Sequence, residues 1–211
     1  MFSPDSKFAR FMGVAFDILL TGILWFVCSL PLITVAVSTT AAYYTMAKVV
    51  RHGEGYLFKE FFHAIKLNIR QSLIPAFFYL LGIVVLVLDI IYVWNNRGTG
   101  NDMMFIILVG VSFIFIAVTI SYPPMLSRFD KSNFELIRLS AFSAFRFLPI
   151  TIVCLIGAVM VAIGIYLMPW ALVVLPGIFL YLITYPMEYV LKKYMAKPEE
   201  GSEEADKWYY K

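Results

Sequence analysis

Hydrophobic positions fill three long blocks of this chain, at residues 11–47, 72–122 and 147–191, and polar residues gather between them. From Phe147 to Met187 there are 41 residues without a single Asp, Glu, Lys or Arg. A straight α-helix of that length would reach roughly 60 Å, whereas the hydrocarbon core of a bilayer is about 30 Å thick. The block must therefore fold back on itself, and we predict an all-α, polytopic membrane helix bundle.

Each block contains a break that divides it in two. Pro31 interrupts the first block, the polar segment 95–101 divides the second, and Met168-Pro169-Trp170 divides the third. Proline cannot continue the helical hydrogen-bond ladder, and an Asn- and Gly-rich segment favours a turn. The pattern predicts six transmembrane segments in three hairpins. Five segments are the alternative if the first block crosses only once, since its second half, Leu32–Val49, is the most polar of the six.

The distribution of cations favours the hairpin in the first block. With six segments, 16 of the 17 Lys and Arg residues lie on one side of the membrane and only Arg97 lies on the other. With five segments, Lys7 and Arg10 would move outside, against the tendency of cytoplasmic loops to carry the excess of cations. We therefore expect a multi-pass protein of the cell membrane with both termini in the cytoplasm.

Two polar loops contain amphipathic segments, Leu57–Arg70 and Asn133–Arg146. In both, apolar residues recur at the i, i+3, i+4, i+7 spacing of a helix and charged residues occupy the remaining positions. Such helices either tether a loop to the membrane surface or dock a partner. Pro75 and Pro149, which follow them, are expected in the first turn of the next helix, where a missing N–H is harmless. Residues 1–195 form a single membrane domain in this interpretation, and 196–211 form a polar, solvated tail.

Composition agrees with a membrane protein. The chain is 61% hydrophobic and 15% charged, with a mean hydropathy of +0.81, whereas a soluble domain is about half apolar and a quarter charged. Cys28 and Cys154 lie in separate apolar runs, so we expect free thiols rather than a disulfide. The run from Phe11 to Val37 is about twice the length of a signal-peptide core and contains Asp17, which argues against cleavage.

Two ionisable residues fall inside the predicted segments, Asp17 and Asp89. Intramembrane charges are costly and therefore mark candidate ion or solute sites. The alternatives are an ion pair of Asp17 with Lys7 or Arg10 and a position of Asp89 in the outer headgroup region. Glu188 is four residues before Lys192, and we expect an ordinary ion pair on the helix surface.

No catalytic arrangement is visible. Both histidines, His52 and His63, lie in the first cytoplasmic loop, and the chain has no HExxH or CxxC motif and no phosphate-binding glycine loop. We expect a non-enzymatic protein without cofactor or metal and without nucleic acid as a partner.

One combination of residues resembles a known family. It comprises Trp25, the string Cys28-Ser29-Leu30-Pro31-Leu32-Ile33-Thr34, the run Ala41-Ala42-Tyr43-Tyr44, and Phe61-Phe62 followed by Lys66 and Asn68. This combination resembles the YesL family of bacterial integral membrane proteins. From it we expect Trp25, Pro31, Thr34, Tyr43 and Asn68 to be functional or structural positions, in addition to Asp17 and Asp89. Where that family usually has a glycine soon after the Leu-Pro-x-x-Thr string, this chain has Val35-Ala36-Val37.

The resemblance implies a protein without an established activity, in a family that accompanies carbohydrate-utilisation and sugar-uptake systems of Gram-positive bacteria. The first functional hypothesis is therefore an accessory or regulatory component of carbohydrate transport. Its partners would be the lipid bilayer and either a sugar transporter subunit or a second copy of the chain. The alternative is a small-solute carrier or channel whose pathway is lined by Asp17, the polar stretch Thr34–Thr40 and Asp89.

Overall fold

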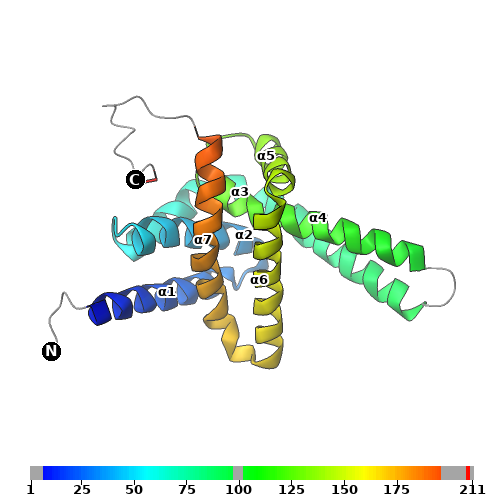
Figure 1. Ribbon diagram of the computed structural model, residues 1–211, viewed down its shortest axis with the longest axis horizontal. Helices are drawn as coiled ribbons and strands as arrows, with labels where there is room; N and C mark the ends of the chain where they lie inside the picture. Colours follow the sequence, from blue (N-terminus) through cyan, green and yellow to red (C-terminus); the bar gives the residue numbers. More distant parts are fainter. Residues whose placement is uncertain (1–6, 97–101, 196–207, 210–211) are drawn as a thin grey trace.

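The computed structural model describes residues 7–96, 102–195 and 208–209, and within these ranges every regular element is a helix (Figure 1). The α-helices are α1 (Lys7–Ser29), α2 (Val35–Thr45), α3 (Leu57–Asn95), α4 (Asp102–Leu126), α5 (Asn133–Arg146), α6 (Leu148–Leu167) and α7 (Leu175–Tyr194). Three short elements join them: the 3₁₀ turns η1 (Leu32–Thr34) and η3 (Pro169–Val173) and the π-helical turn η2 (Met46–Arg51). The all-helical fold class is confirmed.

The three predicted breaks are confirmed. α1 ends one residue before Leu30-Pro31, and α6 ends at Leu167, one residue before Met168-Pro169. α3 ends at Asn95 and α4 begins at Asp102, while the residues between 96 and 102 lie outside the described ranges. The segment Asn133–Arg146 is a separate helix, as its periodicity predicted.

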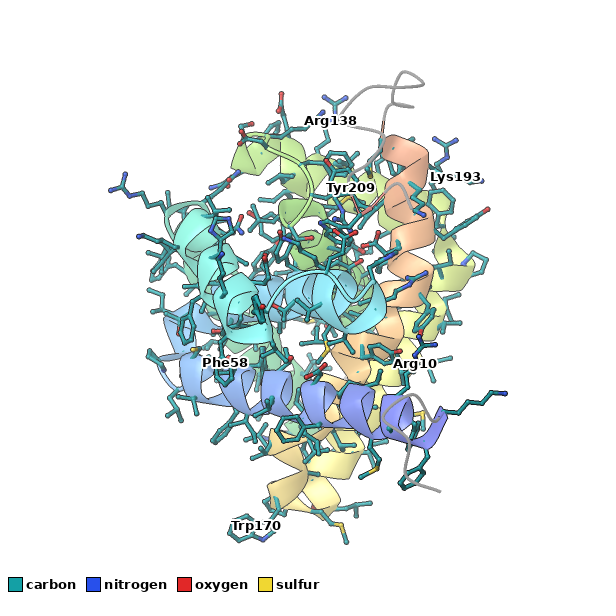
Figure 2. All side chains as sticks on the ribbon, turned by 90° about the vertical axis from the view of Figure 1, so that its left-hand side faces the viewer. Arg10, Phe58, Arg138, Trp170, Lys193 and Tyr209 are labelled. Atoms are coloured by element: carbon teal, nitrogen blue, oxygen red, sulfur yellow. The ribbon has the colours of Figure 1, made fainter. Side chains whose placement is uncertain are left out.

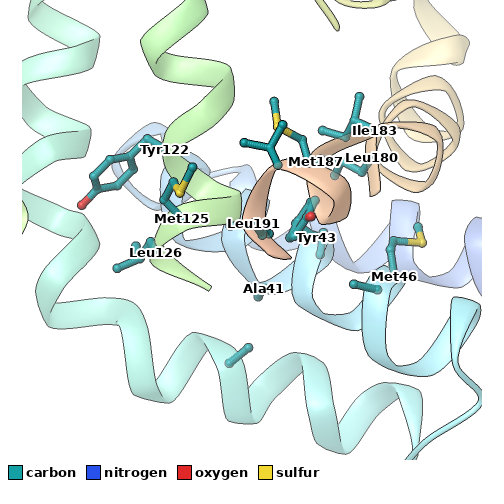
Figure 3. Packing of buried hydrophobic residues seen from close by; sticks show 14 of the residues in the cluster. Ala41, Tyr43, Met46, Tyr122, Met125, Leu126, Leu180, Ile183, Met187 and Leu191 are labelled. Atoms are coloured by element: carbon teal, nitrogen blue, oxygen red, sulfur yellow. The ribbon is translucent and has the colours of Figure 1, made fainter. Parts of the chain in front are cut away.

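The amphipathic segment Leu57–Arg70 is not a separate helix, contrary to expectation. It forms the first part of α3, which continues for 39 residues, with Pro75 in its interior rather than in a first turn. A proline removes one helical hydrogen bond and bends the helix without necessarily ending it. The ribbon of α3 in Figure 3 accordingly runs in two directions. Pro149, in contrast, lies in the first turn of α6 as predicted.

Within the part of the chain that the structure describes, four helices are long and apolar enough to cross a membrane: α1, α3, α4 from Met103, and α6. By their length and composition these helices indicate a membrane protein, but they do not show the number of six segments. α2 has only 11 residues and spans about 17 Å. The apolar sequence of α7 is interrupted by Glu188 and by two lysines in its last turn.

α2 lies at the centre of the molecule. It contacts α1, α3, α4 and α7, and seven of its 11 residues are buried. Buried side chains of α2, α4 and α7 form the main hydrophobic core around Tyr43, Met125 and Leu191 (Figure 3). α4 and the second half of α3 form a hairpin that extends away from this core (Figure 1).

α1 crosses α7 where two glycines meet. A Cβ atom added to Gly177 would lie 3.0 Å from the Cα of Gly22 and 3.0 Å from the carbonyl oxygen of Ile18. Small residues allow membrane helices to approach closely in this way. In both overall views α1 runs across the direction of α6 and α7 rather than along it (Figures 1 and 2).

Candidate functional site: a buried ion pair under an aromatic cap

Arg128 and Glu188 form an ion pair in the interior of the molecule. Arg128 lies two residues after α4, Glu188 lies in α7, and each side chain is only 3% exposed. The hydroxyl of Tyr43 in α2 donates a hydrogen bond of 3.1 Å to Oε1 of Glu188, the same oxygen that accepts from Arg128. One carboxylate therefore joins α2, α4 and α7.

The predicted pair between Glu188 and Lys192 is wrong, because Glu188 points inward. The buried side of α7 includes Leu180, Ile183, Thr184, Met187, Glu188 and Leu191. These positions follow the helical spacing of three and four residues, so Glu188 lies on the apolar stripe of its helix. That periodicity was readable in the sequence and would have indicated an inward carboxylate, although not its partner.

The interpretation of the C-terminal segment as wholly solvated is wrong for Trp208. This side chain is 6% exposed, and its ring centroid lies 4.0 Å from the guanidinium carbon of Arg128. The ring of Tyr209 lies 4.9 Å from the same carbon. Arginine stacks well on aromatic faces, so the two rings cap the cation through cation–π contacts. We call Tyr43, Arg128, Glu188 and Trp208 the Arg128 cluster.

The rim of the Arg128 cluster is aromatic and basic. Tyr44 packs edge-on against Trp208 with ring centroids 5.8 Å apart, and His52 lies 5.5 Å from Trp208. Partial burial and then the neighbouring charge of Arg51 lower the pKa of His52. Arg51 itself donates to the carbonyl oxygen of Thr184 at 3.1 Å, which ties η2 to α7.

A polar cavity of about 320 Å³ lies beside the Arg128 cluster, between α2, α3 and the connection from α4 to α5. Its lining includes Tyr44, Asn68, Gln71, Arg128 and Asp130. Nε of Arg128 and Oε2 of Glu188 are buried without a hydrogen-bond partner in the described part of the protein. A buried polar atom without a partner is costly. The N–H at Nε of Arg128 can still donate a hydrogen bond, and Oε2 of Glu188 can still accept one.

Of the seven predicted site residues, Tyr43 belongs to the Arg128 cluster and Asn68 lines the neighbouring cavity. Trp25, Pro31 and Thr34 instead build the first helical hairpin. The indole N–H of Trp25 donates to the hydroxyl of Thr39 at 3.0 Å. The hydroxyl of Thr34 lies 2.5 Å from the Cys28 carbonyl oxygen and 2.6 Å from that of Pro31, which closes the turn after α1.

Asp17 and Asp89 are not brought together. Asp17 is a half-buried residue in the middle of α1, whereas Asp89 lies near the far end of the hairpin formed by α3 and α4. Both cysteines are free thiols. Within the described ranges, no group of three or more His, Cys, Asp or Glu residues is placed to hold a metal ion.

A family model described as "Protein of unknown function, DUF624" matches residues 18–90. This match covers the second half of α1, all of α2 and most of α3. It is consistent with the resemblance to the YesL family, although its description does not name that family. It includes Tyr43 and Asn68 but neither Arg128 nor Glu188. No similarity to a curated protein or to a solved structure was found.

Proposed function

We propose that this chain is a non-enzymatic integral membrane protein that assists or regulates a transport system through contacts with another membrane protein. The observation that carries the proposal is the Arg128 cluster, in which the buried charges are used to join three helices to Trp208. These contacts fix the arrangement of the surrounding surfaces. Together with the resemblance described above, it supports an accessory component of carbohydrate uptake in a bacterial plasma membrane.

The competing function is a small-solute carrier or channel lined by Asp17, the stretch Thr34–Thr40 and Asp89. The hydroxyls of Thr39 and Thr40 donate to carbonyl oxygens one turn back in their own helix, at 2.7 and 2.9 Å. Hydroxyls bonded in this way satisfy the helix locally and leave less polarity for a solute. This geometry favours the accessory function over the carrier.

The test is purification of the full-length protein from bacterial membranes after gentle detergent extraction. A transporter subunit should copurify with the wild type, and sugar uptake should fall in a deletion strain. A matched pair of variants, Glu188→Gln within the Arg128 cluster and Asp89→Asn outside it, should separate the two hypotheses, because only the first should weaken copurification. Recovery of the protein without any partner, together with unchanged uptake, would refute the accessory function. Solute flux into liposomes containing this protein alone would support the carrier.

We further propose that all three hairpins cross the membrane, with both termini and the amphipathic segments in the cytoplasm. Figure 2 supports the crossing of the third hairpin, since Arg138 and Lys193 lie toward one end of the molecule and Trp170 lies at the other, while Arg10 and Phe58 lie between these ends. α7 has 20 residues, enough for about 30 Å, and α2 with η2 covers residues 35–51, about 26 Å. The first hairpin is therefore the shortest crossing, and it contains the helix that lies across α7.

Cysteine labelling in intact cells tests this arrangement. In a background with Cys28→Ala and Cys154→Ala, the variants Leu30→Cys, Gly98→Cys and Met168→Cys should react with a membrane-impermeant maleimide added from outside. Ser3→Cys should react only after the cells are opened. Protection of Leu30→Cys in intact cells, with labelling of the other two outer positions, would show that the first hairpin does not cross.

A further inference from the structure

We propose that a cleft between α3, α4 and α5 binds one acyl chain of an anionic phospholipid, whose phosphate group is held by Lys131 and Arg138. The cleft has a volume of about 570 Å³ and an almost entirely apolar surface. α3 contributes Ile74 and Phe78, α4 contributes Ile114 and Val118, and α5 closes one end with Phe134 and Ile137.

The position of the cleft selects hydrocarbon as its occupant. α3 and α4 both have the length and hydropathy of membrane-crossing helices, and their cleft residues Ile74 and Phe78 are 61% and 63% exposed. Inside a bilayer the medium that meets such a surface is lipid. A volume of this size also falls within the range of ordinary ligand pockets, so it can hold a chain rather than a single methyl group.

The cations lie at the end of the cleft that α5 closes. Arg138 lies one helical turn after Phe134 in α5, and Lys131 lies two residues before Asn133, which also lines the cleft. Both cations are exposed, and they line a second cavity of about 410 Å³ together with Glu135, Leu139 and Phe142. Glu135 offsets one of the two charges, which leaves this rim with a net positive charge.

Two further features hold the rim in place. The side-chain amide of Gln71 in α3 donates to the carbonyl oxygen of Lys131, which fixes the connection before α5 against α3. Ser132 caps α5, so the positive end of the helix dipole lies next to Lys131. Basic pockets between membrane helices bind anionic lipid headgroups by this combination of charge and adjacent hydrocarbon. The inference does not depend on the proposed function.

The charge requirement is tested by native mass spectrometry of the full-length protein in detergent, titrated with phosphatidylglycerol or with phosphatidylcholine of the same acyl chains. The wild type should bind phosphatidylglycerol about tenfold more tightly than phosphatidylcholine. The double variant Lys131→Gln/Arg138→Gln should lose about tenfold in affinity for phosphatidylglycerol. The control Lys59→Gln/Lys66→Gln removes two exposed cations from the amphipathic part of α3 and should stay within twofold of the wild type.

The requirement for the cleft is tested by filling it. Ile74→Trp places a large ring at its edge, whereas Ile91→Trp makes the same change at an exposed position of α3 outside it. Only Ile74→Trp should reduce phosphatidylglycerol binding. Equal affinity of the wild type for the two lipids would overturn the proposal. So would an equal loss of phosphatidylglycerol affinity in the Lys131/Arg138 and Lys59/Lys66 double variants, or in the Ile74 and Ile91 variants.

Discussion

Arg128 and Glu188 hold two opposite charges at a place that water barely reaches. Moving each ion out of water costs several kcal/mol, and the pair compensates for this only while both partners are present. Tyr43 offsets part of this desolvation cost by donating a hydrogen bond to Glu188, and Trp208 offsets part of it by covering the guanidinium group of Arg128. The Arg128 cluster is consequently a part of the protein where single substitutions should be more damaging than their combination.

Replacing Glu188 by Leu should lower the free energy of unfolding by about 3–5 kcal/mol, because it leaves the charge of Arg128 buried without a partner. The double variant Arg128→Met/Glu188→Leu should lose less than either single variant, since it removes both charges. Thermal or denaturant unfolding in detergent micelles measures this double-mutant cycle. Lys192→Gln is the control and should change stability by less than about 0.5 kcal/mol. Additive losses would mean that the two charges do not interact.

At the scale of the helices, the crossing of α1 and α7 depends on the lack of side chains at Gly22 and Gly177. The hypothetical Cβ atom of Gly177 is 3.0 Å from backbone atoms of α1, and that of Gly22 is 2.7 Å from the carbonyl oxygen of Val173. Backbone atoms cannot rotate away as side chains can, so a methyl group at this crossing must push the helices apart.

Gly177→Ala should therefore destabilise the protein by about 1–3 kcal/mol, despite the better helix propensity of alanine. Gly13→Ala in α1 is the matched control, because nothing lies within 4 Å of its added Cβ atom. That variant should be neutral or stabilised by up to about 1 kcal/mol. Unfolding midpoints of the two variants in the same detergent provide the comparison, and a stabilised Gly177→Ala variant would disprove the close crossing.

At the scale of the whole molecule, the Arg128 cluster brings together segments that are far apart in the sequence. Tyr43 and Glu188 are separated by 145 positions, and Arg128 and Glu188 by 60. Trp208 adds the C-terminal region to the same place, where it also meets η2 through His52. Docking of Trp208 is thus coupled to the packing of α2, α4 and α7.

Trp208→Ala should cost about 2–4 kcal/mol of stability, because it removes a buried ring and its cation–π contact. Trp170→Ala is the control, since the ring of Trp170 is 90% exposed and should contribute less than about 0.5 kcal/mol to folding in detergent. Thermal unfolding followed by near-UV circular dichroism measures both. Equal midpoints for the two variants would mean that Trp208 is not part of the folded core.

The helices, most of their boundaries and the membrane class could be predicted from the amino-acid sequence. These properties depend on local causes: the spacing of apolar residues, the length of uncharged runs and the inability of proline to donate a hydrogen bond. The helix breaks at Pro31 and at Met168-Pro169 and the helix Asn133–Arg146 were predictable for this reason. The continuity of α3 was not, because a proline in the interior of a helix and one at its start look alike in the sequence.

The partners of the charged residues, in contrast, depend on the packing of the folded chain. Local spacing suggested Lys192 as the partner of Glu188, but the fold brought Tyr43 of α2 and Arg128 of the segment after α4 to it. The same long-range packing placed Trp208 over Arg128 and left Asp17 and Asp89 apart. A buried charge is paired with whichever group the folded chain places nearby, since its desolvation cost is the same whatever the separation along the sequence.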